Sequence, residues 1–573
     1  MSKKIISQGI HDFKELIERN FYYVDKSMFI HELVAQGPNK VTIIPRPRRF
    51  GKTLNMTMLK YFFEKPLDGS CNAHLFEGLA ITQYTEIMAR QGTHPIIFIT
   101  FKGIKSSTWE KCYKELVDVI VEECERHKNL LDSNVIDQSW KDHLKALIDK
   151  KTDEVDYAKS LYFLSKALHA MYQTKPIILI DEYDAPMHAG FEFDYYEKIK
   201  NFMYSFFCAG LKDNNNLEFS VITGILRISK ESLFSGINNT ATFSLLNDVY
   251  ADKFGFTHDE VAAIHDYYKL PFDLTEIKKW YNGYRVGSEK EDGTFITMYN
   301  PWSIIECVSN KKIGPFWINT GGHFLIQETM KCASAEDKDA LQSILDGNAV
   351  TQTINDAIVF DTIYTDSSSM WSFLVFTGYL TWEARTDMIG KTTAALIAPN
   401  FEVQDALKTM VMSWFSSAGI EDTFKEMVYA LINLNLPYFG ELFSESVMAS
   451  VSFFDVPKVR PENMYHAFVL GMFVTLADTY VITSNLEAGK GRYDVAIVPK
   501  DKQQPGAVFE FKRKLKKDPR TLEQVAQEAL EQIDERNYTL PLKKQGVTQI
   551  AKVGIAFQGK EVEVAFAVEK TIL

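Results

Sequence analysis

Short apolar runs alternate with longer helical segments along the first 250 or so residues. Four of these runs are rich in β-branched residues, which is typical of buried strands. They occupy residues 41–45, 95–101, 176–181 and 219–226. Helical segments such as 109–127 separate them. Strands that alternate with helices predict a largely parallel, helix-covered sheet, and hence an α/β fold class.

The pattern changes twice in the rest of the chain. From about residue 250 to 450 it is mainly helical, and Thr257 and Glu260 stand at capping-box spacing where one of these helices begins. The last 120 or so residues indicate an apolar helix, a hairpin of two strands and a second helix. We therefore expect three domains, at 1–250, 251–450 and 451–573.

Composition narrows the class of protein. The chain has 573 residues and a net charge of −12, which excludes a generally basic nucleic-acid coat protein but not a local basic site. Its six cysteines form no CxxC pair, so a disulfide framework or thiolate zinc site is not indicated. No secretory signal and no apolar stretch of about 18 residues is visible. We expect a cytoplasmic protein with no membrane partner.

The first candidate binding site lies in the loop between the first predicted strand and the helix that follows it. The loop ends in Gly51-Lys52-Thr53, and strand, loop and helix in this order form the setting in which that tripeptide binds phosphate. Backbone amides would hold the phosphates, Lys52 would reach the β and γ oxygens, and Thr53 would hold Mg²⁺. Arg46 stands where the first glycine of the usual motif is expected. The alternative is a basic surface loop that only precedes a helix.

Acidic and polar residues follow two later strands. The apolar strand 176–181 ends on Asp181-Glu182, so Asp181 could complete the Mg²⁺ shell and Glu182 could polarise the attacking water. Thr223 and Arg227 leave the next strand, where they could sense the γ-phosphate and stabilise transition-state charge. The alternatives are residues that only cap strand ends and an arginine that only faces solvent. Together these residues predict ATP and Mg²⁺ as cofactors.

Several short sequence motifs resemble those of bacterial AAA-ATPase-like proteins with a C-terminal PD-(D/E)XK nuclease-superfamily domain. In chain order they are FYYVDKSMFI (21–30), PRPRRFGKT (45–53), ILIDEYDAP (178–186), TGILRISKESLFSGINN (223–239), WYNGYR (280–285) and YNPWSI (299–304). The arginine-rich loop is that family's form, which explains Arg46. The resemblance implies an AAA-like P-loop ATPase core. It places Arg48 and Arg49 among the nucleotide-binding residues and Asp25-Lys26 near the nucleotide.

The C-terminal hairpin carries a second group of charged residues. If the hairpin turns about residue 503, Asp494 lies opposite Lys512, and Ala496 lies opposite Glu510. The two carboxylates are then diagonal neighbours at about 7–8 Å and could share Mg²⁺ or Mn²⁺. The lysine could orient water or stabilise the pentavalent phosphate. The alternative is a hairpin with exposed charges, but Asp494 with Glu510-x-Lys512 has the PD-(D/E)XK arrangement.

The same resemblance implies further residues in a C-terminal α/β, restriction-endonuclease-like domain. Glu487 could add a carboxylate to the metal shell, and Gln532 and Tyr538 belong to the helix that in this superfamily often faces the site. Glu462 and His466, four residues apart, would share one face of the preceding helix.

A basic run follows Lys512. Residues 512–520 hold six basic residues against one acid, a local charge of +5. Such a run is usually a solvated face, but beside a metal site it could follow a phosphate backbone without reading sequence. No RNP-like motif, zinc finger or helix-turn-helix indicates base-specific recognition.

The functional hypothesis is an ATP-binding and ATP-hydrolysing protein coupled to a metal-dependent nuclease. DNA is favoured over RNA as the partner, and defence against foreign DNA is one role. AAA-like proteins often form rings, which leaves a homo-oligomer open, although the sequence identifies no inter-subunit arginine finger. One alternative is a nucleotide-switched binding or scaffold protein with a non-cleaving nuclease-like domain. Another is an ATPase that acts on protein partners, which would leave the nuclease motif unexplained.

Overall fold

A computed structural model provides the structure of this protein, and its described residues form two compact units. The units are Met1–Cys332 with Ala349–Val403, and Ala333–Asn348 with Gln404–Leu573. The expected three-domain division stays a prediction. The structure describes all residues except 1–2, 36, 38, 67–68, 228–236, 238, 318–323, 332, 346, 358–361, 364–365, 389–390, 417–420, 454–478, 485–486, 489–490, 516–517, 559–560 and 571–573.

The first unit contains a five-stranded sheet whose paired strands are all parallel, in the order β2-β3-β4-β1-β5. The strands are β1 (Val41–Pro45), β2 (Ile96–Thr100), β3 (Ile177–Asp181), β4 (Ser220–Gly224) and β5 (Thr240–Thr242). Every residue of β1, β3 and β4 is buried, as the continuous apolar runs indicated. The predicted α/β class is confirmed. The parallel arrangement brings the carboxyl ends of β1, β3 and β4 to one edge, where ligands bind in such sheets.

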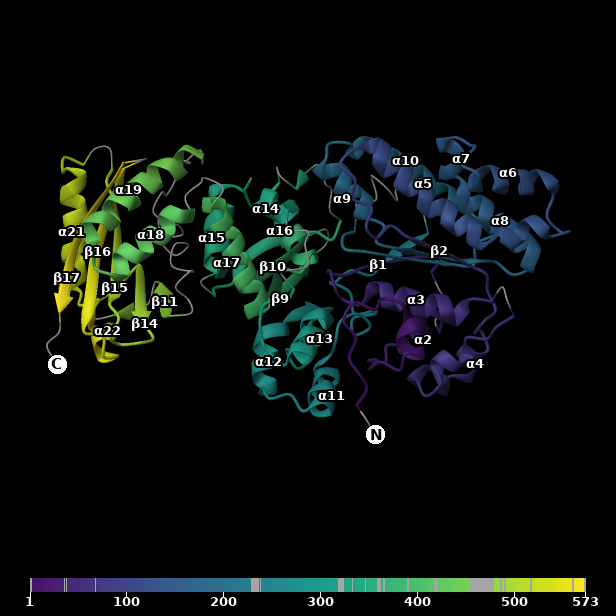
Figure 1. The fold of residues 1–573 in the computed structure, drawn as a ribbon, viewed down its shortest axis with the longest axis horizontal. Coiled ribbons are helices and arrows are strands. Elements are labelled where there is room, and N and C mark those ends of the chain that lie inside the picture. The colour runs from purple at the N-terminus through teal and green to yellow at the C-terminus, as the bar shows by residue number, and fades with distance from the viewer. Residues whose placement is uncertain are drawn as a thin grey trace. The chain divides into compact units, whose positions relative to one another are not determined.

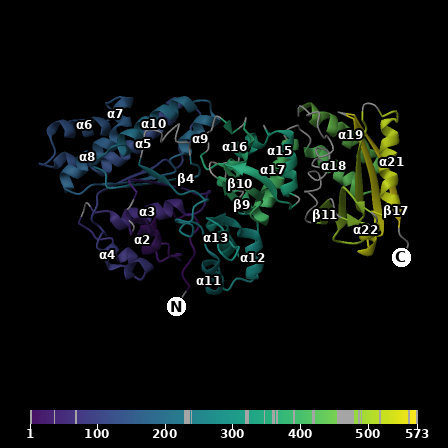
Figure 2. The ribbon, with the colours of Figure 1, turned by 180° about the vertical axis from the view of Figure 1, so that it is seen from behind.

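Helices cover both faces of this sheet. Figures 1 and 2 show α5, α8 and α10 on one face and α2 and α3 on the other. The helices up to β5 are α1 (Phe13–Glu18), α2 (Met28–Val34), α3 (Lys52–Phe63), α4 (Thr85–Met88), α5 (Trp109–Arg126), α6 (Gln138–Ile148), α7 (Glu154–Ala158), α8 (Ser160–Tyr172), α9 (Ala185–Glu192) and α10 (Tyr196–Leu211).

The rest of the first unit is mainly helical and includes two small antiparallel sheets that the sequence pattern had not indicated. Its elements are α11 (His258–Tyr268), α12 (Leu274–Tyr281), β6 (Tyr284–Val286), β7 (Ile296–Met298), α13 (Pro301–Asn310), α14 (Phe324–Lys331), β8 (Val350–Ile354), α16 (Ser367–Phe376), β9 (Thr381–Met388) and β10 (Lys391–Ile397). The capping box predicted at Thr257 and Glu260 is confirmed. Glu260 also binds Lys26 Nζ at 2.7 Å, which joins α11 to the N-terminal segment.

The second unit is built on a sheet in the order β11-β14-β15-β16-β17, in which only the β15–β16 pair is parallel. Its elements are α15 (Ala335–Leu345), the main part of α17 (Phe401–Ser416), α18 (Glu421–Ile432), α19 (Leu436–Phe453), β11 (Tyr480–Ser484), β12 (Glu487–Ala488), β13 (Gly491–Arg492), β14 (Val495–Pro499), β15 (Gly506–Arg513), α21 (Leu522–Glu535), α22 (Leu540–Lys544), β16 (Gln549–Gln558) and β17 (Glu561–Lys570). Helix α21 packs closely on β16, because a Cβ on Gly554 would lie 2.4 Å from the Leu530 amide nitrogen.

Side chains of α5 and of His127, the residue that follows it, cover the outer edge of β2. The Phe98 amide donates to Glu123 Oε1 at 2.9 Å, and His127 Nε2 lies 3.0 Å from the Ile96 carbonyl oxygen. Arg126 holds the same carboxylate through its Nε and Nη2 atoms, at 2.8 and 2.6 Å. These contacts satisfy backbone groups that an edge strand would otherwise leave open.

Replacing Glu123 with alanine should lower the free energy of unfolding by about 2 kcal/mol, because the half-buried Arg126 loses its two-point partner and keeps only Glu64, and the Phe98 amide loses its acceptor. Urea denaturation followed by circular dichroism measures this change. Glu125→Ala is the matched control, since Glu125 is exposed on the same helix and should contribute less than about 0.5 kcal/mol. Equal effects of the two substitutions would contradict the role given to Glu123.

The same carboxylate should make the fold sensitive to acid. Burial alone would raise the pKa of Glu123, but the charge and hydrogen bond of Arg126 lower it to about 2, from an ordinary value of 4.5. Its stabilising contribution is therefore complete above about pH 4.5 and is lost as the pH falls towards 2. Urea titrations repeated across this window should show a smaller loss of stability in Glu123→Gln than in the wild type.

Candidate functional sites

The loop between β1 and α3 wraps around the ammonium group of Lys52. Gly51, which precedes α3, has a φ of +79°, and Arg49 has a φ of +67°. Left-handed residues of this kind turn successive amides towards one point, which suits an anion. Lys52 is buried, and its Nζ donates to the carbonyl oxygens of Arg46 and Pro47 at 3.0 and 2.9 Å. The lysine thus lies inside the loop that was predicted to bind phosphate.

Arg46, at the position of the missing glycine, holds the loop in place from outside. Its side chain is buried and donates to the carbonyl oxygens of Phe243 and Tyr250 at 2.7 and 3.2 Å. The guanidinium also lies 5.3 Å from the ring centre of Phe254. Burial lowers the pKa of Arg46 to about 9. These contacts fasten the loop to the segment after β5, which is why an arginine can replace glycine here.

Three of the predicted residues meet at Asp181, the last residue of β3. Thr53 Oγ1 donates to Asp181 Oδ2 at 2.7 Å, and Thr223 Oγ1 donates to Asp181 Oδ1 at 2.8 Å. Asp181 is fully buried. A hydroxyl from the start of α3 that faces a carboxylate from the end of β3 is the donor set that magnesium uses in phosphate-binding loops. The residues therefore fit the expected ion.

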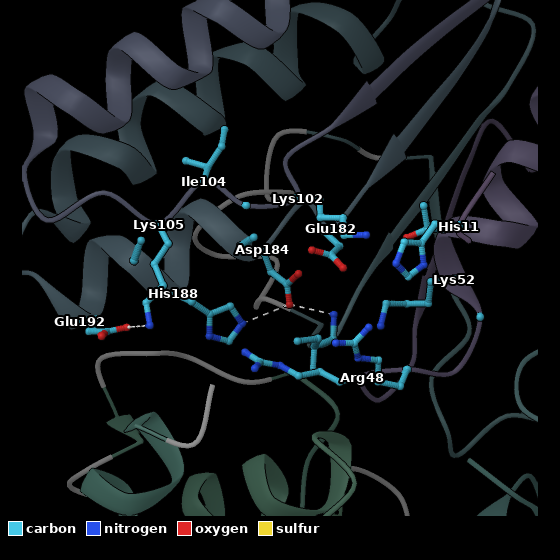
Figure 3. A pocket seen from close by; sticks show the side chains of 17 residues that line it. His11, Arg48, Lys52, Lys102, Ile104, Lys105, Glu182, Asp184, His188 and Glu192 are labelled. Atoms are coloured by element: carbon cyan, nitrogen blue, oxygen red, sulfur yellow. Dashed lines mark hydrogen bonds and ion pairs between the residues drawn. The ribbon is translucent and has the colours of Figure 1, made fainter. Parts of the chain in front are cut away.

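A cavity of about 550 Å³ opens beside these groups. Its lining includes Arg48, Arg49, Lys52, Lys102, Lys105, Glu182, Asp184 and Glu192. Five Lys and Arg side chains against three Asp and Glu side chains give it an excess of positive charge, which suits a polyphosphate. Figure 3 shows Lys52, Arg48 and Glu182 around the cavity.

Glu182 occupies this cavity in a strained backbone conformation. Its φ of +52° is uncommon for a residue with a side chain, and such strain concentrates at functional sites. Burial raises the pKa of Glu182, whereas the positive charge of Lys52 lowers it. A carboxylate whose pKa is raised by burial is a stronger proton acceptor than an exposed one.

The second site lies where β14 and β15 pair, and here the predicted register is wrong. Ala496 pairs with Val508, and Val495 pairs with Phe509, so Ala496 does not lie opposite Glu510. The turn is centred near residue 502, one residue earlier than predicted, because the Gln504 amide bonds back to the Asp501 carbonyl oxygen at 3.0 Å.

The corrected register brings the two predicted carboxylates closer together. Continued by one pair beyond the ladder, it places Asp494 opposite Glu510 instead of Lys512. Opposite residues of a ladder have Cβ atoms about 4.5–5.5 Å apart, less than the diagonal spacing that was expected. Asp494 Oδ2 accepts the Phe511 amide at 2.7 Å, which fixes its carboxylate beside β15.

Glu510 has the surroundings of a cation ligand. It is only 6% exposed, and its Oε1 accepts a hydrogen bond from Gln532 Nε2. Its Oε2 is buried and has no hydrogen-bond partner among the described residues. Burial, followed by the negative charge of Asp494, raises the pKa of Glu510 to about 8. A divalent cation between the two carboxylates would satisfy that oxygen, so these residues fit Mg²⁺ or Mn²⁺.

The other predicted residues of this site have different positions. Lys512 Nζ donates to Glu528 Oε1 at 2.5 Å, and Tyr538 is buried in the core against Tyr493, with ring centres 6.2 Å apart. Glu487 pairs with Arg492 in β12 and β13, but its side chain lies outside the described part of the structure. In the described ranges, no group of three or more acidic, His or Cys side chains could hold a metal ion. The predictions for Glu462 and His466 lie outside the described residues.

Two family models match this chain. Residues 7–234 match a family described as predicted AAA-ATPases, and residues 460–567 match the PD-(D/E)XK nuclease superfamily. The chain joins an AAA-ATPase-like domain to a PD-(D/E)XK nuclease-superfamily domain. A protein of Azotobacter chroococcum mcd 1, described as an uncharacterized protein in the vnfD 5' region, is 25% identical over 512 residues. The alignment covers 87% of this chain and 88% of that relative. Within the described ranges, every helix is too short or too polar to span a bilayer.

Arg227 of the ATPase-like domain does not line the cavity. Its Nη1 donates to Asp356 Oδ1 at 2.6 Å, and Ser244 Oγ donates to Asp356 Oδ2 at 3.3 Å. Asp356 lies 129 residues further along the chain, so no sequence spacing could have indicated this ion pair. The structure therefore brings Thr223 to the site and holds Arg227 on another carboxylate.

Sequence reasoning missed Asp184 and His188 of the ATPase-like domain. Asp184 accepts the Ile225 and Leu226 amides at 2.8 and 3.0 Å and lies 3.3 Å from His188 Nε2 (Figure 3). Burial alone would raise the pKa of Asp184, but the hydrogen bonds of His188 and of both amides lower it. Asp184 thus ties the end of β3 to the end of β4. It lies three residues after Asp181 at a carboxyl edge, which was the available signal.

Residues 299–304 place the start of helix α13 against the loop between β1 and α3. Asn300 Nδ2 donates to the Arg48 carbonyl oxygen at 3.3 Å, and the Arg49 guanidinium lies 4.3 Å from the ring centre of Trp302. Arg49, Gly51 and Lys26 also line a smaller cavity of about 140 Å³ beside the loop. The expectation that Asp25-Lys26 lies near the nucleotide stays a prediction.

Proposed function

We propose that this protein binds and hydrolyses ATP with Mg²⁺ and cleaves nucleic-acid phosphodiester bonds with a divalent metal ion. The observation that carries the nuclease half is that Glu510 Oε2, beside Asp494, is buried and has no hydrogen-bond partner in the described part of the chain. Carboxylates placed in this way need a cation, and a bound divalent ion can activate water at a phosphodiester.

In the ATPase half, the residues are arranged for phosphoryl transfer. Mg²⁺, when bound, would neutralise charge on the phosphate oxygens. Thr53 and Asp181, already in contact, would hold this ion. Lys52 would exchange its two loop carbonyl partners for β and γ oxygens. Glu182 would orient the attacking water and accept its proton, and Thr223 would sense the γ-phosphate through Asp181.

In the nuclease half, each residue has a separate task. A metal ion, when bound, would supply a water of lowered pKa. Asp494 and Glu510 would hold it, and Gln532 keeps the Glu510 carboxylate turned towards it. Lys512, two residues after Glu510 on the same strand, would stabilise charge on the phosphate in the transition state. Glu487 would add a further carboxylate.

We further propose that helix α13 transmits the nucleotide state. Trp302 holds Arg49 at the cavity, and Ser303 of the same helix donates to Glu402 Oε2 at 2.7 Å. Glu402 also accepts the Phe316 and Trp317 amides, each at 2.6 Å. It belongs to α17 (Phe401–Ser416), the helix in which the chain leaves the first unit and enters the second. A displacement of Arg49 by nucleotide would therefore act on this helix.

The substrate we propose is DNA in preference to RNA, and defence against foreign DNA is a setting in which ATP would gate such a nuclease. The match to the nuclease superfamily supports a nucleic-acid partner. One observation favours a second candidate, a nucleotide-switched protein that binds without cutting: the Lys512 ammonium bonds to Glu528. Cleavage assays separate the two candidates.

The test is a panel of linear, circular and single-stranded DNA and single-stranded RNA, each incubated with Mg²⁺, Mn²⁺ or EDTA. We expect metal-dependent cleavage of DNA by the wild type and none by Asp494→Asn. The matched control is Asp501→Asn, an exposed residue in the turn of the same hairpin, which should cut at the wild-type rate. Binding without cleavage in every metal would instead support the non-cutting protein.

A further inference from the structure

The first and last residues of the basic run 512–520 both bond to the carboxylate of Glu528. Lys512 Nζ donates to Glu528 Oε1 at 2.5 Å, and Arg520 Nη1 donates to Glu528 Oε2. Arg520 is also held by Asp518, through Nε at 2.9 Å. Two cations separated by eight positions in the chain thus converge on one anionic group of helix α21.

Helix α21 and strand β15 carry these groups, and two side-chain contacts join them at successive positions. Gln532 bonds to Glu510, and Glu528, one helical turn away, bonds to Lys512, two residues along β15. Four residues of helix rise by about 6 Å and two residues of strand by about 6.6 Å, so the contacts stay in step. The contact of Glu528 with Lys512 therefore lies one such step along β15 from Glu510 of the proposed metal site.

The group on which the two cations converge can be reached from solvent. The side chain of Glu528 is 42% exposed, that of Arg520 is 47% exposed and that of Lys512 is 22% exposed. The hydrogen bond of Lys512 lowers the pKa of Glu528, so this carboxylate is an anion at neutral pH. Carboxylate and phosphate oxygens are interchangeable partners for lysine and arginine.

We propose that Lys512 and Arg520 form a phosphate subsite for a nucleic-acid strand, and that Glu528 occupies this subsite in the free protein. The inference rests on the proposed nuclease function, because it adds Arg520 to the phosphate contact that the proposed mechanism gives to Lys512. An incoming strand displaces Glu528, while Asp518 keeps Arg520 in position. Lys512 is then released at the moment when substrate arrives.

The test measures binding of a short fluorescein-labelled single-stranded DNA to the full chain by anisotropy, in EDTA so that no cleavage occurs. Glu528→Gln should lower Kd by about three- to tenfold, since it removes the competing charge. Glu523→Gln is the matched control, because Glu523 is exposed on the same helix and makes the same change in net charge. Arg520→Gln should raise Kd and reduce the slope of log Kd against log salt by about 1.

The outcomes separate this inference from the proposed function. Tighter binding in Glu528→Gln than in Glu523→Gln, largely lost in the double variant with Arg520→Gln, supports the subsite. Equal binding by Glu528→Gln and Glu523→Gln overturns the subsite and leaves a nucleic-acid-binding protein. No DNA binding by the wild type or any variant overturns both.

Discussion

Replacing Lys52 with alanine should lower kcat/KM for ATP hydrolysis by at least about 100-fold, because one preorganised cation in a dry site contributes that much or more. The Lys52 ammonium is buried within the phosphate loop and is already held by two of its carbonyl groups. It therefore needs little rearrangement to meet the phosphate oxygens. Alanine would leave those carbonyl groups without the lysine donor and would remove a cation from the cavity lining.

Release of inorganic phosphate measures this effect at saturating and limiting ATP. Lys60→Ala is the matched control, because Lys60 belongs to the same helix but does not line the cavity. Its ammonium lies 5.1 Å from the ring centre of Tyr61. It should hydrolyse ATP within about twofold of the wild type. Thermal unfolding should show that both variants are folded. Undiminished turnover in Lys52→Ala would refute the assignment of this loop.

Replacing Glu510 with glutamine should lower metal-dependent DNA cleavage by at least about 100-fold, because it removes one of the carboxylates proposed to hold the metal ion. In EDTA the same change should increase the free energy of unfolding by about 1 kcal/mol. Glutamine removes a carboxylate whose charge is disfavoured by burial and by the neighbouring charge of Asp494, the two causes that raise the pKa of Glu510. Loss of activity would thus accompany a gain in stability, the opposite of what general damage to the fold would produce.

Cleavage rates and urea denaturation, measured on the same samples, test both parts. Adding Mn²⁺ should stabilise the wild type but not Glu510→Gln, since a ligand that binds only the folded state raises its stability. Glu531→Gln, an exposed change on α21, is the control and should retain cleavage and the response to metal. A Glu510→Gln variant that cleaves DNA at the wild-type rate would contradict the metal site.

The features that sequence could predict are those set by neighbouring residues. The strands of the first sheet follow from continuous apolar runs, and the capping box at Thr257 follows from a three-residue spacing. The meeting of Thr53, Asp181 and Thr223 follows from the rule that parallel strands end at one edge.

The features that sequence could not predict depend on contacts between distant residues or on one turn. The burial of Arg46 needs carbonyl groups about 200 positions away, and the ion pair of Arg227 needs Asp356. The hairpin register differs from the predicted one because the turn, which contains the bond from the Gln504 amide to the Asp501 carbonyl oxygen, is centred one residue earlier. Since strand faces alternate, such details decide which charged groups meet.

The central claim, that a nucleotide site controls a nuclease site, is tested most directly by the ATP dependence of DNA cleavage. The measurement compares cleavage rates with and without ATP, in the preferred metal, for the wild type, Lys52→Ala and Lys512→Ala. We expect ATP to change the rate in the wild type, to leave it unchanged in Lys52→Ala, and no cleavage in Lys512→Ala. Wild-type cleavage that is the same with and without ATP, or cleavage that survives Lys512→Ala, would contradict the claim.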